Sequence, residues 1–187
     1  IQEGQTVLTH GMSRVVASIL LKAAETKHFD IIFLEGRPDA AGSKAAKAYA
    51  SHSSSIPTTV VLDAAVGHVM ERVDVVLVGA EAIVENGGFV NKMGTYALAA
   101  CAQAHGKPLY VAAESLKFSR LYPLNQRDLP DLGNSPISFV DTTSSSSSMK
   151  QKGNNQDQSS LLESIDLPES VTIDNPPCDF TPASFIN

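Results

Sequence analysis

Five short apolar runs constrain the fold of this chain more than any other feature of its sequence. They are rich in Val, Ile and Leu and do not alternate apolar with polar residues, which is typical of strands covered on both faces. The runs occupy residues 6–9, 30–35, 58–63, 73–80 and 108–113. The sequence therefore predicts a sheet that is buried beneath helices.

Helical segments separate most of these runs. They occupy residues 13–27, 43–53, 64–73 and 95–106. In the first segment, Val16, Ile19 and Leu20 recur at helical spacing. Thr95 and Gly106 are predicted as the N-cap and the C-terminal stop of the last segment. Strands that alternate with helices in this way predict a mostly parallel sheet with helices on both faces.

The chain divides into three parts by composition. Residues 1–140 hold the predicted strands and helices and form one α/β domain. Residues 141–170 are dominated by Ser, Gln, Asn and Asp, and so little apolar surface predicts a disordered insertion. Residues 171–187 regain aromatic side chains and are expected to return to the same domain. The chain starts at Ile1 and ends with this return segment. We therefore expect a fragment that lacks its natural N-terminus and a last strand.

The overall charge and the cysteines exclude several classes of protein. The net charge is −6 without a dense Lys/Arg run, so nucleic acid and acidic membranes are not expected as partners. No signal peptide or membrane-spanning run is present, which predicts a cytosolic protein. Neither the two cysteines nor the histidines have metal-ligand spacing, and no GxGxxG or P-loop motif occurs. We expect no metal and no organic cofactor.

Polar side chains follow the ends of several predicted strands, where open α/β sheets bind ligands. The candidate ligand residues are Thr9, Ser13, Arg37, Asp63, Glu81, Asn91 and Lys92. Arg37 and Lys92 near a helix N-terminus would suit a phosphate, and Asp63 and Glu81 would hold sugar hydroxyls or move protons. The alternative is that such residues only cap helices and turn the chain, which is the favoured interpretation for Asp63 alone. Gly87 and Gly88 predict the turn of a hairpin, and His10 is expected to make a structural hydrogen bond.

An ordered series of motifs gives the chain a family resemblance. LTH, ExRP, LD, VGA, NG and NKxGT follow one another within residues 1–131, and DFTPASFI comes later. The series resembles the alpha, beta and delta subunits of eukaryotic translation initiation factor 2B and, more distantly, methylthioribose-1-phosphate and ribose-1,5-bisphosphate isomerases. The stretch AESLKFSRLYPLNQRDLPD is most similar to the alpha subunit. The resemblance implies the Rossmann-like, three-layer α/β/α C-terminal domain of that family.

The resemblance also implies that isomerase chemistry has been lost. Gly11 stands where the isomerases carry a catalytic Cys, and Glu81 stands where they carry a catalytic Asp. Glycine has no side chain to move a proton, and the extra methylene of Glu shifts its carboxyl by about 1 Å, which can cost roughly 100-fold in rate. Arg37, Asn91 and Lys92 are retained on the phosphate side. A sugar phosphate or nucleotide is therefore the expected effector.

The partners implied by the resemblance are proteins. In this family the alpha subunit dimerises through this domain, joins the beta and delta subunits and helps to sense translation initiation factor 2 phosphorylated on its alpha subunit. Nucleotide exchange belongs to the epsilon subunit. Phe118, Arg120 and Tyr122 are predicted interface residues, because aromatic and basic side chains lie together there. The alternatives are an ordered loop packed on its own domain and, for the whole protein, a sugar-phosphate isomerase or sensor.

Overall fold

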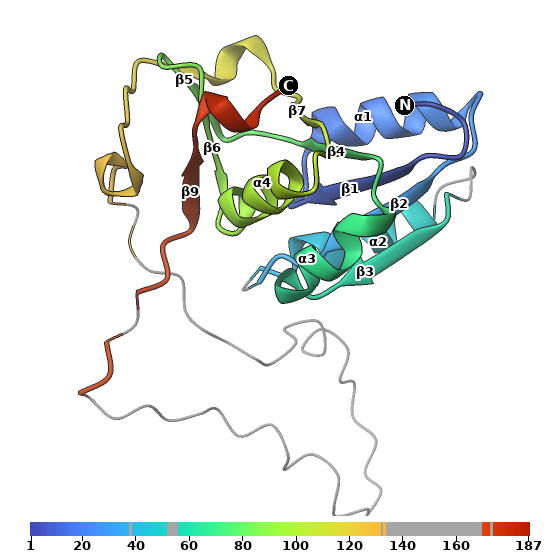
Figure 1. Cartoon of the computed structure of the whole chain (residues 1–187), viewed down its shortest axis with the longest axis horizontal. Helices are drawn as coiled ribbons and strands as arrows, with labels where there is room; N and C mark the ends of the chain where they lie inside the picture. Colours follow the sequence, from blue (N-terminus) through green and yellow to red (C-terminus); the bar gives the residue numbers. More distant parts are fainter. Residues whose placement is uncertain (38, 52–55, 132, 134–169, 173) are drawn as a thin grey trace, which may run out of the picture.

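Five parallel strands form the main sheet of the computed structural model, which describes residues 1–37, 39–51, 56–131, 133, 170–172 and 174–187. The strand order is β3-β2-β1-β4-β7 (Figure 1). The strands are β1 (Thr6–His10), β2 (Asp30–Leu34), β3 (Thr58–Val61), β4 (Val75–Val78) and β7 (Leu109–Val111). All five predicted strands are confirmed, although all except β1 are shorter than their apolar runs. In register, Val7 of the central strand lies between Ile31 and Val75.

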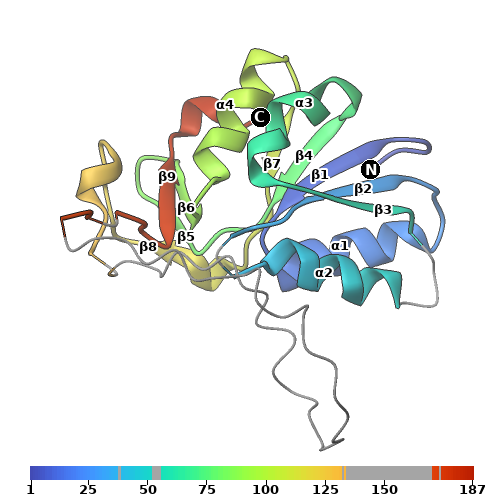
Figure 2. The ribbon, with the colours of Figure 1, turned by 90° about the horizontal axis from the view of Figure 1, so that it is seen from below.

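Helices cover both faces of the main sheet, as predicted for a three-layer α/β/α fold (Figure 2). On one face, α1 (Arg14–Ala24) and α2 (Ala41–Ala50) share a buried cluster with the side chains of Val7, Ile31 and Phe33. On the other face, α3 (Val66–Val69) and α4 (Thr95–Ala104) share a second cluster with the side chains of Leu8, Ile32 and Val76. Both faces are therefore buried, which explains why the strand sequences do not alternate.

Two predicted helix details are wrong. The helix expected at 64–73 is not continuous. The short α3 is preceded by one 3-10 turn, Asp63–Ala65, and followed by another, Met70–Arg72. The N-cap of α4 is Gly94 rather than Thr95, with φ of 102°, a left-handed conformation that suits glycine. Thr95 is the first helical residue, and its buried hydroxyl donates to the carbonyl of Lys92 at 2.7 Å.

A second, smaller sheet packs beside the main one and was not predicted. Its strand order is β8-β5-β6-β9, and it contains the hairpin expected at Gly87 and Gly88. The strands are β5 (Ala82–Val84), β6 (Phe89–Lys92), β8 (Phe118–Ser119) and β9 (Cys178–Thr181). Strand β9 comes from the predicted return segment and lies beside β6 (Figure 1). The two strands pair antiparallel, so that Cys178 lies opposite Lys92. The segment predicted as an insertion, 141–170, lies outside the described residues except for Ser170.

Within the part of the chain that the structure describes, no helix combines the length and apolar character needed to cross a membrane.

Candidate functional site

A polar pocket of about 170 Å³ lies at the carboxyl ends of β1 and β4. The loop after β1 and the first turn of α1 supply residues 11–15, the loop after β4 supplies residues 79–81, and the loop after β7 supplies residues 112–114. Four of the seven predicted ligand residues line this polar pocket, namely Ser13, Glu81, Asn91 and Lys92. The position agrees with the rule that open α/β sheets bind ligands at the carboxyl ends of their strands.

Two lysines give the polar pocket its positive charge. The Nζ atom of Lys92 lies 3.5 Å from a carboxylate oxygen of Asp39, and the Nζ atom of Lys117 lies 3.4 Å from a carboxylate oxygen of Glu81. The side chains in these pairs are between 35% and 59% exposed. Long, solvent-exposed ion pairs contribute about 0–1 kcal/mol. Both lysines can therefore exchange their present partner for an anionic ligand at little cost.

Lys117 and Arg14 were missed in the sequence. Arg14 also lines the polar pocket, and its guanidinium lies 3.5 Å from a carboxylate oxygen of Glu114. Arg14 directly follows Ser13 and could have been found from that position. Lys117 reaches the pocket because β8 pairs parallel with β5, which brings Phe118 opposite Ile83 and places Lys117 beside Glu81. Nothing in the local sequence indicates that pairing.

The N-terminus of α1 borders the polar pocket. The Ser13 hydroxyl accepts a hydrogen bond from the backbone N–H of Val16 at 3.3 Å and caps the helix. Ser13 packs closely against Gly79. A Cβ atom added at position 79 would lie 2.6 Å from the Cβ atom of Ser13, so glycine leaves the room that Ser13 needs. The positive end of the α1 dipole therefore adds to the lysine charges, which favours an anion.

Asn91 is buried in the wall of the polar pocket rather than free to reach a ligand. Its side chain is 6% exposed, and its Nδ2 atom donates to the hydroxyl of Thr95 at 3.1 Å. The hydroxyl in turn donates to the carbonyl of Lys92. Asn91 thus links the end of β6 to the start of α4, next to Lys92.

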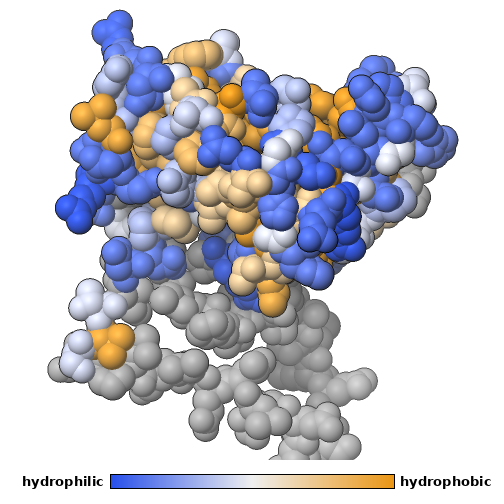
Figure 3. Space-filling view, viewed as in Figure 1, coloured by the Kyte–Doolittle hydropathy of each residue, from blue (hydrophilic) through white to orange (hydrophobic). Residues whose placement is uncertain are grey.

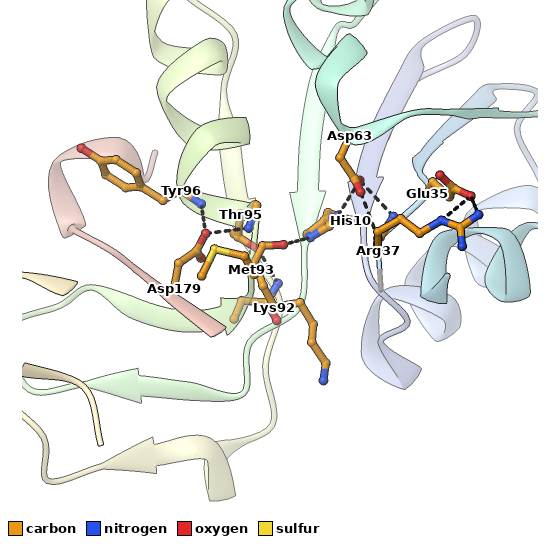
Figure 4. A network of polar contacts seen from close by, with 12 residues as sticks. His10, Glu35, Arg37, Asp63, Lys92, Met93, Thr95, Tyr96 and Asp179 are labelled. Carbon is orange, nitrogen blue, oxygen red and sulfur yellow. Dashed lines mark hydrogen bonds and ion pairs between the residues drawn. The ribbon is translucent and has the colours of Figure 1, made fainter. Parts of the chain in front are cut away.

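Arg37 does not join the lysines in the polar pocket. Its Nε and Nη2 atoms lie 3.0 and 2.7 Å from the same carboxylate oxygen of Glu35 (Figure 4). It lines a neighbouring cavity of about 20 Å³ that also contacts Lys92, Asp39 and Gly11. The predicted meeting of Arg37 and Lys92 is therefore only partial, because a nearer carboxylate holds the guanidinium.

Asp63 and Thr9 lie outside the lining of the polar pocket. The Asp63 carboxylate accepts hydrogen bonds from the backbone N–H groups of Gly36 at 2.9 Å and Arg37 at 3.0 Å (Figure 4). It therefore turns the loop after β2, as in the favoured interpretation. The side chain of Thr9 is 2% exposed, and the residue lines an apolar cavity of about 250 Å³ between α1 and α2. The structure therefore does not place these two residues with the four predicted ligand residues that line the polar pocket.

His10 makes the structural hydrogen bond expected of it. Its Nε2 atom donates to the carbonyl of Met93 at 2.9 Å, and its Nδ1 atom lies 3.9 Å from a carboxylate oxygen of Asp63 (Figure 4). The ring is 2% exposed and joins β1 to the turn that precedes α4.

Gly11 borders the polar pocket in a conformation that few other residues adopt. Its φ of 75° lies in the left-handed region, where any other side chain is strained. There is room for a side chain, since an added Cβ atom would meet only the Cγ atom of Lys92, at 3.7 Å. Backbone conformation, rather than lack of space, therefore favours glycine here.

An apolar groove of about 570 Å³ lies on the other side of the turn after β6. Its walls include Val90 of β6, Tyr96 of α4 and Leu121 and Leu129 of the loop after β8. A mildly apolar surface extends over the region of the alanine-rich α4 (Figure 3). Glu81 lines both the polar pocket and the apolar groove, so the two hollows share a wall.

Asp179 of β9 is the buried carboxyl group of the apolar groove. It is 5% exposed and accepts hydrogen bonds through Oδ2 from the backbone N–H groups of Gly94 at 2.8 Å and Tyr96 at 3.0 Å (Figure 4). Burial raises the pKa of Asp179 to about 6, against the opposing effect of these N–H donors. Burial likewise raises the pKa of the neighbouring Cys178 thiol, partly offset by Lys92.

We call residues 115–124, which contain the predicted interface residues, the apolar segment. Its backbone is anchored at Leu121, whose carbonyl accepts from Glu85 N at 2.9 Å. Just beyond it, Gln126 exchanges two hydrogen bonds with the backbone of Phe180, at 2.7 and 2.8 Å. Four large apolar side chains nevertheless face solvent: Leu116 (90% exposed), Phe118 (72%), Tyr122 (63%) and Leu124 (76%). The segment is thus packed on its own domain along one side and exposes apolar surface along the other.

No group of three or more His, Cys, Asp or Glu side chains is arranged to hold a metal ion among the described residues.

The model of the Initiation factor 2 subunit family matches residues 1–187. The translation initiation factor eIF2B subunit alpha of Dictyostelium discoideum is 46% identical over 187 residues, which are 100% of this chain and 53% of that protein. The ribose 1,5-bisphosphate isomerase of Archaeoglobus fulgidus is 38% identical over 120 residues, which are 64% of this chain and 38% of the isomerase. This chain therefore spans about half or less of the length of these relatives.

Structural similarity agrees with the match in sequence. The crystal structure of the Pyrococcus horikoshii OT3 translation initiation factor eIF-2B superposes with a TM-score of 0.72 at 28% sequence identity. The superposition covers 100% of this chain and 56% of the archaeal chain.

Proposed function

The chain belongs to the Initiation factor 2 subunit family, and from this membership we propose that it is part of a non-catalytic, regulatory subunit of a guanine nucleotide exchange factor. The exchange factor would act on translation initiation factor 2, in the cytosol. The observation that carries this proposal is the 46% identity to an alpha subunit over the whole chain. Because an isomerase is also a relative, the residues of the polar pocket must discriminate between the two functions.

The loss of isomerase chemistry is supported by the two positions that the family resemblance singles out. Gly11 has no side chain and a left-handed backbone conformation, so a cysteine there would be strained. The side chain of Glu81 is 48% exposed and faces Lys117, which leaves its carboxylate paired in the free protein. A general acid/base pair needs two titratable groups in fixed positions, and the position of Gly11 supplies none.

The same pocket supports binding of a phosphorylated small molecule, either a sugar phosphate or a nucleotide. Lys92, Lys117 and Arg14 provide cations, and the N-terminus of α1 adds its dipole. Glu81 and Glu114 would accept hydrogen bonds from sugar hydroxyls. The bound molecule would act as an effector, because the pocket lacks half of the acid/base pair.

The apolar segment supports assembly with protein partners. Exposed Phe118 and Tyr122 beside Arg120 provide the aromatic and arginine anchors that dominate affinity at interfaces. We assign this surface to the homodimer contact or to the contact with the beta and delta subunits. The assembled complex would then respond to translation initiation factor 2 phosphorylated on its alpha subunit.

Two measurements test this function. Affinity purification of the tagged protein from cell extract is expected to recover the beta and delta subunits. A coupled assay with methylthioribose 1-phosphate and ribose 1,5-bisphosphate is expected to show no turnover.

The second candidate function, a sugar-phosphate isomerase, is favoured by the 38% identity to the archaeal ribose 1,5-bisphosphate isomerase. It would be adopted if either substrate were converted and if conversion disappeared in Glu81→Ala. A protein that binds sugar phosphates but recovers neither subunit would instead be a free-standing sensor.

A further inference from the structure

The position of Lys92 in the polar pocket depends on a turn that lies outside that pocket. Lys92 is the last residue of β6, and only Met93 and Gly94 separate it from the start of α4. Gly94 has φ of 102°, and a Cβ atom added there would lie 3.4 Å from Nε2 of His10. The turn is therefore tightly constrained, and a small change in it moves the backbone from which the lysine side chain extends.

The side chain of Asp179 contacts this turn from the side of β9. Its carboxylate accepts hydrogen bonds from the N–H groups of Gly94 and Tyr96 (Figure 4). The backbone N–H of Met93 donates to the carbonyl of Pro177 at 3.0 Å. Asp179 belongs to β9, 85 residues after Gly94 in sequence, and lines the apolar groove but not the polar pocket. Asp179 therefore contacts the backbone next to Lys92 but does not contact the space that a ligand would fill.

We propose that Asp179 is a positioning residue for the polar pocket, which fixes the Met93–Gly94 turn and thereby holds Lys92 where it meets an anion. The inference rests on the proposed anion-binding role of the pocket and assigns to it a residue of the apolar groove. A buried carboxylate with two backbone donors suits this role because its own rotamer is fixed by those hydrogen bonds. Burial raises the pKa of Asp179 to about 6, and the backbone N–H donors lower it, so these hydrogen bonds favour the charged carboxylate.

A simple charge effect predicts the opposite result and can be separated from positioning. Removing a negative charge near an anion site strengthens anion binding, and Asp179→Ala and Asp179→Asn remove the same charge. Only Asn retains a carbonyl oxygen that can accept from Gly94 and Tyr96. Positioning therefore predicts that the two variants differ, whereas a charge effect predicts that they behave alike.

The test is calorimetric titration of ribose 5-phosphate into the wild-type protein, Lys92→Ala, Asp179→Ala, Asp179→Asn and the double variant Lys92→Ala/Asp179→Ala. We expect Asp179→Ala to weaken binding about tenfold and Asp179→Asn to stay within about threefold of the wild type. The double variant should bind no more weakly than Lys92→Ala alone, because Asp179 acts through Lys92. Equal affinities in Ala and Asn, or additive losses in the double variant, would overturn the inference.

A second pair of measurements needs no ligand and separates this inference from the proposed function. The NMR signal of ¹³C-methylated Lys92 and the exchange rates of the Gly94 and Tyr96 amides should change in Asp179→Ala but not in Asp179→Asn. If the wild type binds no ribose 5-phosphate, the proposed effector role fails. If the Lys92 signal is unchanged in Asp179→Ala, the positioning role fails, whatever the result of the titration. Should Asp179→Ala not fold, Gly94→Ala strains the same turn without altering Asp179. It must then shift the Lys92 signal and weaken ribose 5-phosphate binding about tenfold, and wild-type behaviour of this variant would contradict the inference.

Discussion

The polar pocket and the apolar segment meet at Lys117, yet they are built in opposite ways. The pocket holds charged side chains in long ion pairs of 3.4–3.5 Å, with the Asn91 side chain and Gly11 buried in its wall. The segment has a backbone fixed by hydrogen bonds but exposes large apolar side chains, up to 90% for Leu116. The two regions are therefore suited to different kinds of binding partner. The pocket can exchange weak ion pairs for an anion, and the segment can bury apolar surface against a partner.

The largest expected effect is on the apolar segment. The double substitution Phe118→Ser/Tyr122→Ser should lower the oligomer mass measured by light scattering, because losing two interface anchors costs about 2 kcal/mol or more each. The circular dichroism melt of the chain should be nearly unchanged, since both side chains are already mostly exposed.

Leu62→Ser is the matched control for that experiment. Leu62 is 65% exposed, close to the 63% of Tyr122, but lies beyond the end of β3. The control should keep the wild-type mass. If the double variant also keeps that mass, or if it unfolds, the segment only covers its own domain and the interface lies elsewhere.

The next effect concerns Asp179, the buried carboxyl group of the apolar groove. Its folded pKa of about 6 exceeds the unfolded value of about 3.9, so the folded state binds more protons between these pH values. The contribution of this group to stability is therefore present below pH 4 and is lost as the pH rises to about 6. Two pKa units correspond to a loss of about 3 kcal/mol.

Asp179→Asn isolates that contribution, because the other titrating groups are shared with the wild type. Urea unfolding should be measured at pH 4, 5, 6 and 7.5. From pH 4 to about pH 6, the free energy of unfolding of the wild type should fall relative to that of Asp179→Asn. Above this window, the difference between the two proteins should stay constant. Parallel pH profiles of the two proteins would show that the buried carboxyl does not titrate there.

The third prediction concerns the two cationic side chains predicted to bind a phosphate, Lys92 and Arg37. Lys92→Ala should weaken ribose 5-phosphate binding by roughly 10- to 100-fold, since a charge-assisted hydrogen bond contributes about 1.5–3 kcal/mol. Arg37→Ala should have a smaller effect, because Glu35 already holds the guanidinium outside the pocket. Calorimetry of both variants gives the comparison.

Lys44→Ala serves as the control for non-specific charge, because Lys44 is exposed on α2 away from the pocket lining. Equal losses in all three variants would indicate a diffuse electrostatic effect rather than a site. A larger loss in Arg37→Ala than in Lys92→Ala would move the phosphate to the smaller neighbouring cavity.

The smallest expected effect is at the helix that borders the pocket. Ser13→Ala removes the N-cap of α1 and should lower the free energy of unfolding by about 1 kcal/mol in urea titrations. Ser13→Thr keeps a hydroxyl and should recover part of the loss. An unchanged free energy in Ser13→Ala would mean that water replaces the cap and that the hydroxyl is available to a ligand.

Local sequence patterns were sufficient for the layers of the fold and for part of the pocket. Apolar runs without alternation predicted strands buried on both faces, and the clusters on either side of the main sheet show why, since both faces exclude water. Two glycines predicted the hairpin between β5 and β6. Lys92 and Ser13 were found because each lies at the end of a strand or at the start of a helix, where a sheet of this type binds ligands.

The three-layer fold, the family and the edge of the sheet at which the polar residues gather all follow from the amino-acid pattern along the chain. Which of those residues share a pocket depends on tertiary contacts, because polar side chains compete for the nearest partner. Glu35 holds the side chain of Arg37, two backbone amides occupy Asp63, and β8 brings Lys117 to Glu81, 36 residues away. Asp179 reaches Gly94 across 85 residues, through a strand pairing that no short pattern encodes. Periodicity reports burial along one element, whereas the composition of a site depends on the register between elements far apart in sequence.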